Sequence, residues 1–358
     1  MIPYFAFTII LVWLLYLATL LFFKPKDPNG RPENYPLVSI LISLRNEASN
    51  VESLCESLNA LLYPKSRFEI LFGDDGSEDN TLELLKKHKP ENAAVYSLGN
   101  EQTGDFGKQK VLNVLSKEAN GEYFLFTDAD MIFQSEWIQG MLSQATESNV
   151  LVVGMTKVEG KGFMASLQNM DWLFNEWLIG WFSKLGISLT AWGNNMLISK
   201  SAYNDIGGHD QLADTIVEDV RLLRALVTNG GNLKVNFNPN AVAITQPTST
   251  FLELLYQRKR WIKGVNGFNP IIWAGGLIKG LFWPSVIFVS FGNPFGLLLA
   301  FLAILFRFLI LKRIETLTKS QFSILHYLIF EVYDFAFYLI TFAFYILPIR
   351  VDWKGRKY

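Results

Sequence analysis

Residues 123–130 read Tyr123-Phe124-Leu125-Phe126-Thr127-Asp128-Ala129-Asp130, an apolar run that ends in two carboxylates. A short apolar run of this kind is typical of a strand that is buried on both faces of a parallel sheet. In open sheets of this class, ligands bind beyond the carboxyl ends of the strands. The stretch therefore predicts an α/β fold with a candidate site at Asp128 and Asp130.

Further apolar runs lie on both sides of this stretch, and segments with helical spacing separate them. Helical spacing is present at residues 51–62, 81–88, 108–119 and 137–148. Strands that alternate with helices predict a doubly wound, mostly parallel sheet of the Rossmann type. The five predicted strands are residues 37–44, 68–72, 93–98, 123–126 and 150–153.

The overall composition excludes two classes of protein. The formal net charge of -1 over 358 residues argues against a nucleic-acid binder, which normally carries a basic surface. Cys55 is the single cysteine, so the chain forms neither an internal disulfide nor a zinc site built on several thiolates. Its place in a helical apolar pattern predicts a small core residue. Such sparse use of cysteine fits a catalytic domain in a reducing compartment.

The first apolar segment, residues 2–23, holds no charged side chain and spans roughly 30 Å as a helix. No Lys or Arg precedes it and its end is a poor cleavage site, so we favour an uncleaved anchor over a secretory signal peptide. Lys24, Lys26 and Arg31 follow the segment. By the positive-inside rule, these cations predict that the next domain lies in the cytosol.

The second apolar segment, residues 281–311, is too long for one straight span and short for two spans with a turn. Pro284, Gly292 and Pro294 interrupt its first half. We therefore expect an interfacial or re-entrant piece up to residue 291, followed by one span.

The third apolar segment, residues 322–347, contains Glu331 and Asp334 on one helix face. Acidic groups inside a membrane are costly and are candidates for function. Arg307 in the preceding span is a plausible partner, and we favour a structural ion pair over a catalytic role. Two C-terminal spans return the basic tail to the cytosol, as expected for an integral protein of a bacterial inner membrane.

The predicted organisation has one anchor, one catalytic domain and a membrane-embedded C-terminal part. The catalytic domain and the C-terminal tail are both expected in the cytosol. The predicted boundaries are an anchor at 1–23, a catalytic domain at 24–248, interfacial amphipathic helices at 249–280, a transmembrane region at 281–347 and a basic tail at 348–358.

Three further motifs carry charge at the ends of predicted elements. Asp74-Asp75-Gly76-Ser77 follows a strand and is either a simple turn or part of the site. Glu218-Asp219 opens a helix, where it either complements the helix dipole or supplies a general base. Gln257-Arg258-Lys259-Arg260-Trp261 reads as a basic membrane-surface helix, in which Arg260 could face a diphosphate while Lys259 meets lipid headgroups.

These motifs, in the order Asp74-Asp75-Gly76-Ser77, Asp128-Ala129-Asp130, Glu218-Asp219 and Gln257-x-x-Arg260-Trp261, resemble those of the family 2 inverting glycosyltransferases of GT-A fold. The match covers roughly residues 37–273. Leu44-Arg45-Asn46-Glu47 is similar to the family's opening nucleotide-binding loop, and Gly107-Lys108 to its Gly-Lys segment. The tail 353–358 and the number of membrane segments resemble the ceramide-glucosyltransferase-like and hopanoid-type branch, which implies a lipid acceptor.

The resemblance implies a role for each matching residue. Glu47, beside Asn46, and Asp75 would contact the uridine end of a UDP-sugar. Asp128 would contact the nucleotide, Asp130 beside it would ligate Mg²⁺ or Mn²⁺, and Lys108 would lie near the phosphates. Asp219, next to Glu218, would deprotonate the acceptor hydroxyl. Gln257, Arg260 and Trp261 would shape the acceptor side and hold the diphosphate.

The acceptor side is less well determined by the sequence. The apolar stripe at residues 162–186 is either core or one wall of a lipid entry cleft, and Trp192 and Asn194 after it could line the acceptor pocket. Two alternatives stay open: a processive polysaccharide synthase, and a catalytically silent membrane scaffold of the same fold. Val217 stands where many polymer synthases have Thr, which argues mildly against a synthase. The expected partners are a UDP-sugar, a lipid or lipid-linked acceptor and the membrane, without nucleic acid.

Overall fold

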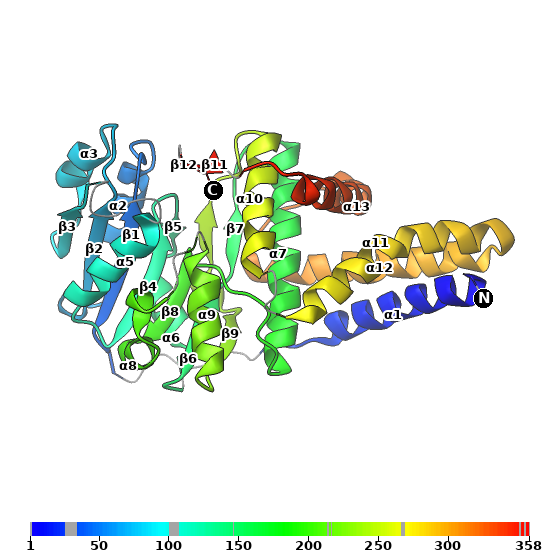
Figure 1. Cartoon of the computed structure of the whole chain (residues 1–358), viewed down its shortest axis with the longest axis horizontal. Helices are drawn as coiled ribbons and strands as arrows, with labels where there is room; N and C mark the ends of the chain where they lie inside the picture. The colour runs from blue at the N-terminus through cyan, green and yellow to red at the C-terminus, as the bar shows by residue number, and fades with distance from the viewer. Residues whose placement is uncertain are drawn as a thin grey trace.

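The computed structural model describes an α/β unit joined to a bundle of long apolar helices (Figure 1). The predicted Lys26 and Arg31 lie outside the described residues. The described residues are 2–25, 34–99, 107–145, 147–212, 215, 217–265, 269–350, 352–353 and 356–357.

The α/β unit is built on a seven-stranded sheet with the order β3-β2-β1-β4-β8-β6-β9. Most neighbouring pairs are parallel, and β8 alone runs antiparallel to its neighbours β4 and β6 within this sheet. The prediction of a mostly parallel sheet is therefore confirmed. Its strands are β1 Val38–Leu44, β2 Phe68–Asp74, β3 Ala93–Ser97, β4 Tyr123–Asp128, β6 Val150–Gly154, β8 Asn195–Ser199 and β9 Asn232–Asn236.

The central strands are apolar along their whole length because helices cover both faces of the sheet. Ile40 and Ile42 of β1 pack into a core with one set of helices, and Leu41 packs into the core on the opposite face. Cys55 is buried in the first of these cores, as predicted. The first face is covered by α2 Val51–Asn59, α3 Thr81–His88 and α6 Trp137–Leu142, and the second by α5 Gly107–Glu118, α8 Lys200–Asp205 and α9 Glu218–Thr228.

A long helix, α7 Phe163–Lys184, connects the α/β unit to the membrane part (Figure 1). Its buried face packs against α1 Ile2–Phe22, and the Trp177 indole donates a hydrogen bond to the Leu20 carbonyl (3.1 Å). Leu173 and Trp177 are fully buried. The apolar stripe of this helix is therefore chiefly a packing surface between two parts of the protein.

Among the residues that the structure describes, four helices are long and apolar enough to cross a membrane, one more than the sequence predicts. The extra one is α11 Pro270–Gly292, which runs unbroken through Pro284 and through the expected boundary at residues 280 and 281. A proline is tolerated there because neighbouring apolar helices support the turn that it weakens. The other three are α1, α12 Phe295–Thr318 and α13 Ile324–Ile346.

A buried ion network joins the last three helices. The Arg307 guanidinium lies 2.7 Å from the Asp334 carboxylate and 3.2 Å from that of Glu331. Lys279 of α11 adds a second cation, 2.6 Å from Asp334. The predicted pairing with Arg307 is confirmed, and the balance of two cations and two anions supports a structural role.

Both ends of α13 are attached to helices next to the α/β unit. At its start, His326 stacks on Phe163 of α7 with ring centroids 4.4 Å apart. At its end, the Lys259 ammonium of α10 Phe251–Val265 donates to the carbonyls of Phe344 (3.0 Å) and Leu347 (2.5 Å). The prediction that Lys259 meets lipid headgroups is therefore wrong: the side chain is buried and caps the C-terminal end of α13.

Candidate functional site

Strand register brings the first motif residues to one edge of the sheet. Leu44 is opposite Asp74 across β1 and β2, and Ser43 is opposite Asp128 across β1 and β4. Because β8 is antiparallel to β4, with Asn195 opposite Thr127, its first residue lies at the same edge. The loops that follow or precede these strand ends therefore converge on one region, as the rule for ligand sites in open sheets predicts.

Lys108 connects two of the acidic motifs. Its ammonium lies 2.7 Å from the carboxylate of Asp128 and 2.7 Å from that of Glu218. Burial alone would lower the pKa of Lys108, but the two negative charges outweigh it and hold that pKa above its ordinary value. The side chain is thus a fixed cation at the edge of the sheet, and the family resemblance implies that the donor phosphates would lie near it.

Asp219 lies beside this cation. One carboxylate oxygen accepts from the Gly193 amide (2.8 Å) and the other from the Val220 amide (2.7 Å). Burial, followed by the charge of Glu218, raises the pKa of Asp219 to about 6, while Lys108 acts in the opposite direction. A carboxylate with a pKa near the working pH is suited to general base catalysis.

Asp130 approaches the site from the loop after β4. Its carboxylate accepts a hydrogen bond from the Thr245 hydroxyl (3.0 Å) at the end of β10 Ala243–Thr245. This strand belongs to a small sheet with β5 Ile132–Phe133 and β7 Thr156–Val158. The position of Asp130 is therefore set by a residue far away in the sequence.

The donor set of Asp128 and Asp130 fits a hard divalent cation. Within the described residues no group of three or more His, Cys, Asp or Glu side chains is placed to hold a metal. Mg²⁺ is commonly bound by one or two carboxylates that share it with phosphate oxygens and water. Two carboxylates at this edge match that mode of binding, and they do not match a metal site made by the protein alone.

The loops on the nucleotide side are tied to each other. The Asn46 side-chain oxygen accepts a hydrogen bond from the Glu78 backbone amide (2.9 Å), and the Asn46 backbone amide donates one to the Ser77 hydroxyl (3.0 Å). Asn46 has a left-handed backbone (φ 53°), which asparagine tolerates better than most residues. Glu47 and Asp75 are buried in these loops, where Asp75 presents its carbonyl to Arg45 (2.7 Å).

Helix α10 presents its basic residues in different directions. The Arg258 guanidinium is buried and pairs with Asp171 of α7 (2.6 Å). Arg260 instead interacts electrostatically with Asp219, and Gly264 packs closely on Val217 just before α9. Arg260 is therefore the cation of the motif that faces the carboxylates. Gln257 and Trp261 lie on the same helix, half-buried.

The two residues predicted for the acceptor pocket are fixed by hydrogen bonds to neighbouring strands. The Trp192 indole donates to the Gly154 carbonyl (2.7 Å), and the Asn194 side chain accepts from the Thr156 hydroxyl (3.2 Å). Thr156 also contacts Glu176, a buried residue that the motifs do not include. One feature of the sequence could have indicated Glu176: Asp171 and Glu176 are the two acidic residues in the otherwise apolar helix at 163–184. No feature of the sequence indicates that Thr245 contacts Asp130 or that Gly193 contacts Asp219.

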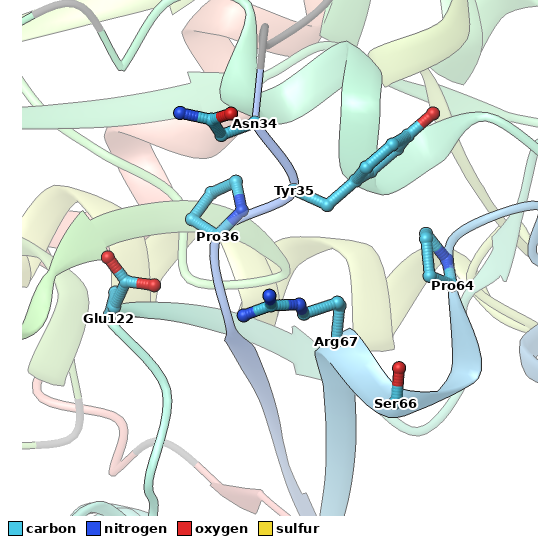
Figure 2. Close-up of a pocket in the computed structure, with 7 residues that line it drawn as sticks. All are labelled: Asn34, Tyr35, Pro36, Pro64, Ser66, Arg67 and Glu122. Atoms are coloured by element: carbon cyan, nitrogen blue, oxygen red, sulfur yellow. The ribbon is translucent and has the colours of Figure 1, made fainter.

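A cavity of about 560 Å³ lies at the opposite edge of the sheet (Figure 2). It is next to the first residues of β1, β2 and β4, where Glu122 accepts from the Leu37 amide (3.0 Å). Ligands of open α/β sheets bind at the carboxyl ends of the strands, so this cavity is not the candidate site. Its lining consists of Asn34, Tyr35, Pro36, Pro64, Ser66, Arg67 and Glu122.

Comparison with known proteins matches the chain to glycosyltransferases and to synthases of glycans and glycolipids. Residues 5–358 match the model of Glycosyl transferase family 21. Poly-beta-1,6-N-acetyl-D-glucosamine synthase of Staphylococcus aureus (strain COL) is 28% identical over 246 residues, 67% of this chain and 57% of that protein. Beta-monoglucosyldiacylglycerol synthase of Trichormus variabilis is 25% identical over 246 residues, 66% of this chain and 52% of that protein. The chain thus spans little more than half the length of these relatives.

A solved structure extends the comparison to the fold of almost the whole chain. Mannosyltransferase PcManGT from Pyrobaculum calidifontis, in complex with GDP-Man and Mn²⁺, aligns with a TM-score of 0.59 at 16% identity. The alignment covers 96% of this chain and 95% of that one. The predicted GT-A fold is thereby confirmed.

Proposed function

We propose, since this chain belongs to glycosyl transferase family 21, that it transfers a sugar from a UDP-sugar to a lipid or lipid-linked acceptor at the membrane surface. The match to this family confirms the prediction, based on the four sequence motifs, that the chain is a membrane-associated glycosyltransferase. The observation that carries the finer proposal is the Lys108 ammonium between Asp128 and Glu218, with Asp219 next to it.

The proposed reaction is a single displacement. Asp219 accepts the proton of the acceptor hydroxyl, whose oxygen attacks the anomeric carbon as the bond to the nucleotide diphosphate breaks. Attack from the face opposite the leaving group inverts the anomeric configuration. Lys108 and Arg260 neutralise negative charge on the departing diphosphate. A divalent cation bound at Asp128 and Asp130 would supply further neutralisation of that charge.

The membrane part supports an acceptor that is presented at the bilayer surface. Helix α10, which carries Arg260, is attached to α13 through Lys259 and to α7 through Arg258. The candidate site and the apolar helices therefore share one structural element. One relative is a lipid glycosyltransferase by its name, beta-monoglucosyldiacylglycerol synthase.

A second function is favoured by the other relative, which is a polysaccharide synthase by its name. Product size separates the two proposals. A lipid transferase yields single additions to a lipid, whereas a synthase yields long chains.

We also propose that α1, α11 and α12 cross the membrane while α13 lies along its surface. The two ends of α13 contact α7 and α10, and in Figure 1 α13 runs in a different direction from the long bundle of the other three helices, although its middle is paired with α11 and α12. This arrangement leaves the α/β unit and residues 348–358 on the cytosolic side. Cysteines introduced at Ile349 and near Lys319 should then react with a membrane-impermeant reagent from the same side of the membrane, because α13 does not cross it. The native Cys55 is buried and should not contribute to the labelling.

The direct test is a screen of UDP-sugars for hydrolysis, followed by mass spectrometry of lipid extracts with and without the enzyme. Asp219→Asn is expected to lower transfer by about 10²–10⁴-fold while UDP binding with Mn²⁺ in calorimetry stays near the wild-type value. Asp210→Asn, on the surface, is the matched control. Substantial transfer by Asp219→Asn would refute the base, and wild-type protein without metal-dependent UDP binding would favour the silent scaffold.

A further inference from the structure

Two tryptophans from different helices meet next to the candidate site. Trp172 of α7 and Trp261 of α10 lie edge to face, with ring centroids 5.0 Å apart. Both are only half-buried. The Arg258 guanidinium lies 4.3 Å from the Trp261 ring and 5.7 Å from the Trp172 ring, and Asp171 holds it in place (2.6 Å). The pair is therefore rigid while part of each ring stays accessible.

Glu176 fixes the orientation of Trp172. Its carboxylate accepts from the Trp172 indole (2.8 Å) and from the Thr156 amide (3.0 Å), and the side chain is 2% exposed. Burial raises the pKa of Glu176 well above its ordinary value, and no cation pairs with it among the residues that the structure describes. Such a buried acid is costly to the fold. The carboxylate holds both the Thr156 amide and the Trp172 indole, so it keeps the half-exposed ring in one orientation relative to β7.

The tryptophan pair is connected to the proposed base by two routes. Along one route, Glu176 contacts Thr156, which bonds Asn194, and the neighbouring Gly193 amide donates to Asp219. Along the other, Trp261 directly follows Arg260, the cation that faces Asp219. The two rings are thus held in a fixed relation to the carboxylate that would deprotonate the acceptor.

We propose that Trp172 joins Trp261, which the family resemblance already assigns to the acceptor side, in an aromatic platform that binds the polyol headgroup of the acceptor, with Glu176 as the positioning residue for Trp172. This inference rests on the proposed function and adds an acceptor-binding residue to it. Tryptophan rings bind the C–H faces of sugars and polyols through apolar contact, and they favour the membrane interface. Arg258 also lies 5.7 Å from the Phe337 ring of α13, so the platform adjoins the proposed surface helix.

The test compares acceptor and donor kinetics in the full-length protein in detergent micelles. The acceptor probe is a total lipid extract titrated at saturating donor, and the donor is the UDP-sugar that the screen identifies. Trp172→Ala is expected to raise the acceptor KM by about 10–100-fold and to leave the donor KM within about twofold. Trp172→Phe should recover part of the loss, and Glu176→Gln should raise the acceptor KM several-fold. Trp181→Ala, a half-buried tryptophan on the other end of α7, is the control.

The outcomes separate this inference from the function on which it rests. An unchanged acceptor KM in Trp172→Ala, or equal rises in donor and acceptor KM, would overturn the platform. If Trp172→Ala does not fold, Trp172→Phe and Glu176→Gln carry the same comparison. Wild-type protein that hydrolyses no UDP-sugar would instead overturn the proposed function.

Discussion

Replacing Glu218 by glutamine is expected to move the acid limb of the pH–rate profile toward lower pH. The wild-type limb should lie near pH 6, because Asp219 acts as a base only when ionised and its pKa is raised to about 6. Glu218 is one cause of that rise, so removing its charge makes Asp219 easier to ionise. The same change removes a negative charge that neutralises the Lys108 ammonium, and the freed positive charge lowers the pKa of Asp219 further.

The structure sets the size of this effect. Oxygens of Glu218 and Asp219 lie 3.4 and 3.5 Å from the point where a Cβ on Gly193 would stand, so they are at most about 7 Å apart. Two charges at that separation interact by about 2 kcal/mol at an effective dielectric constant of about 20. An interaction of about 2 kcal/mol corresponds to a displacement of about 1.5 pH units, and this is the shift that we expect.

The assay is kcat/KM for the acceptor against pH at saturating donor. Glu147→Gln is the matched control, since Glu147 pairs with Lys234 on the surface (2.7 Å) and should leave the profile unchanged. An acid limb that stays in place or moves to higher pH in Glu218→Gln would show that Asp219 is not the group that titrates.

Three further changes test the supporting structure. Lys259→Met removes the donor to the last carbonyls of α13 and should lower the free energy of unfolding by about 1–3 kcal/mol, seen as a lower Tm in detergent. Gly264→Ala brings a Cβ to 2.7 Å from Val217, so α10 must shift from the start of α9 and kcat should fall several-fold at nearly constant donor KM. Asp334→Asn removes one of the two carboxylates that face Arg307 and should cost about 3 kcal/mol, measured as loss of folded protein on heating.

The first two of these changes each have a control on the same chain. Lys263→Met is exposed on α10 and should leave Tm unchanged. Gly275→Ala meets no atom within 4 Å and should leave kcat unchanged. Equal effects in a variant and its control would contradict the contact assigned to that residue, and an Asp334→Asn protein as stable as wild type would contradict the structural ion network.

The sequence by itself determined the class of fold and the edge of the sheet where the site lies. Apolar runs such as residues 123–126 specify buried strands through local patterning, and Asp128 follows from where that strand ends. The apolar length of residues 2–23 predicted the first membrane helix in the same way. These features depend on neighbouring residues alone, so they can be predicted without knowledge of the chain's path.

Only the tertiary structure decided which charged groups face one another. Lys108 meets Glu218 across 110 positions of sequence, and burial together with the opposing charges of Glu218 and Lys108 shifts the pKa of Asp219. Lys259 and Arg260 are adjacent in the motif, yet one caps α13 and the other faces Asp219, because successive residues on a helix point in directions about 100° apart. Burial and long-range electrostatics depend on packing between distant segments, which a local pattern of residues does not encode.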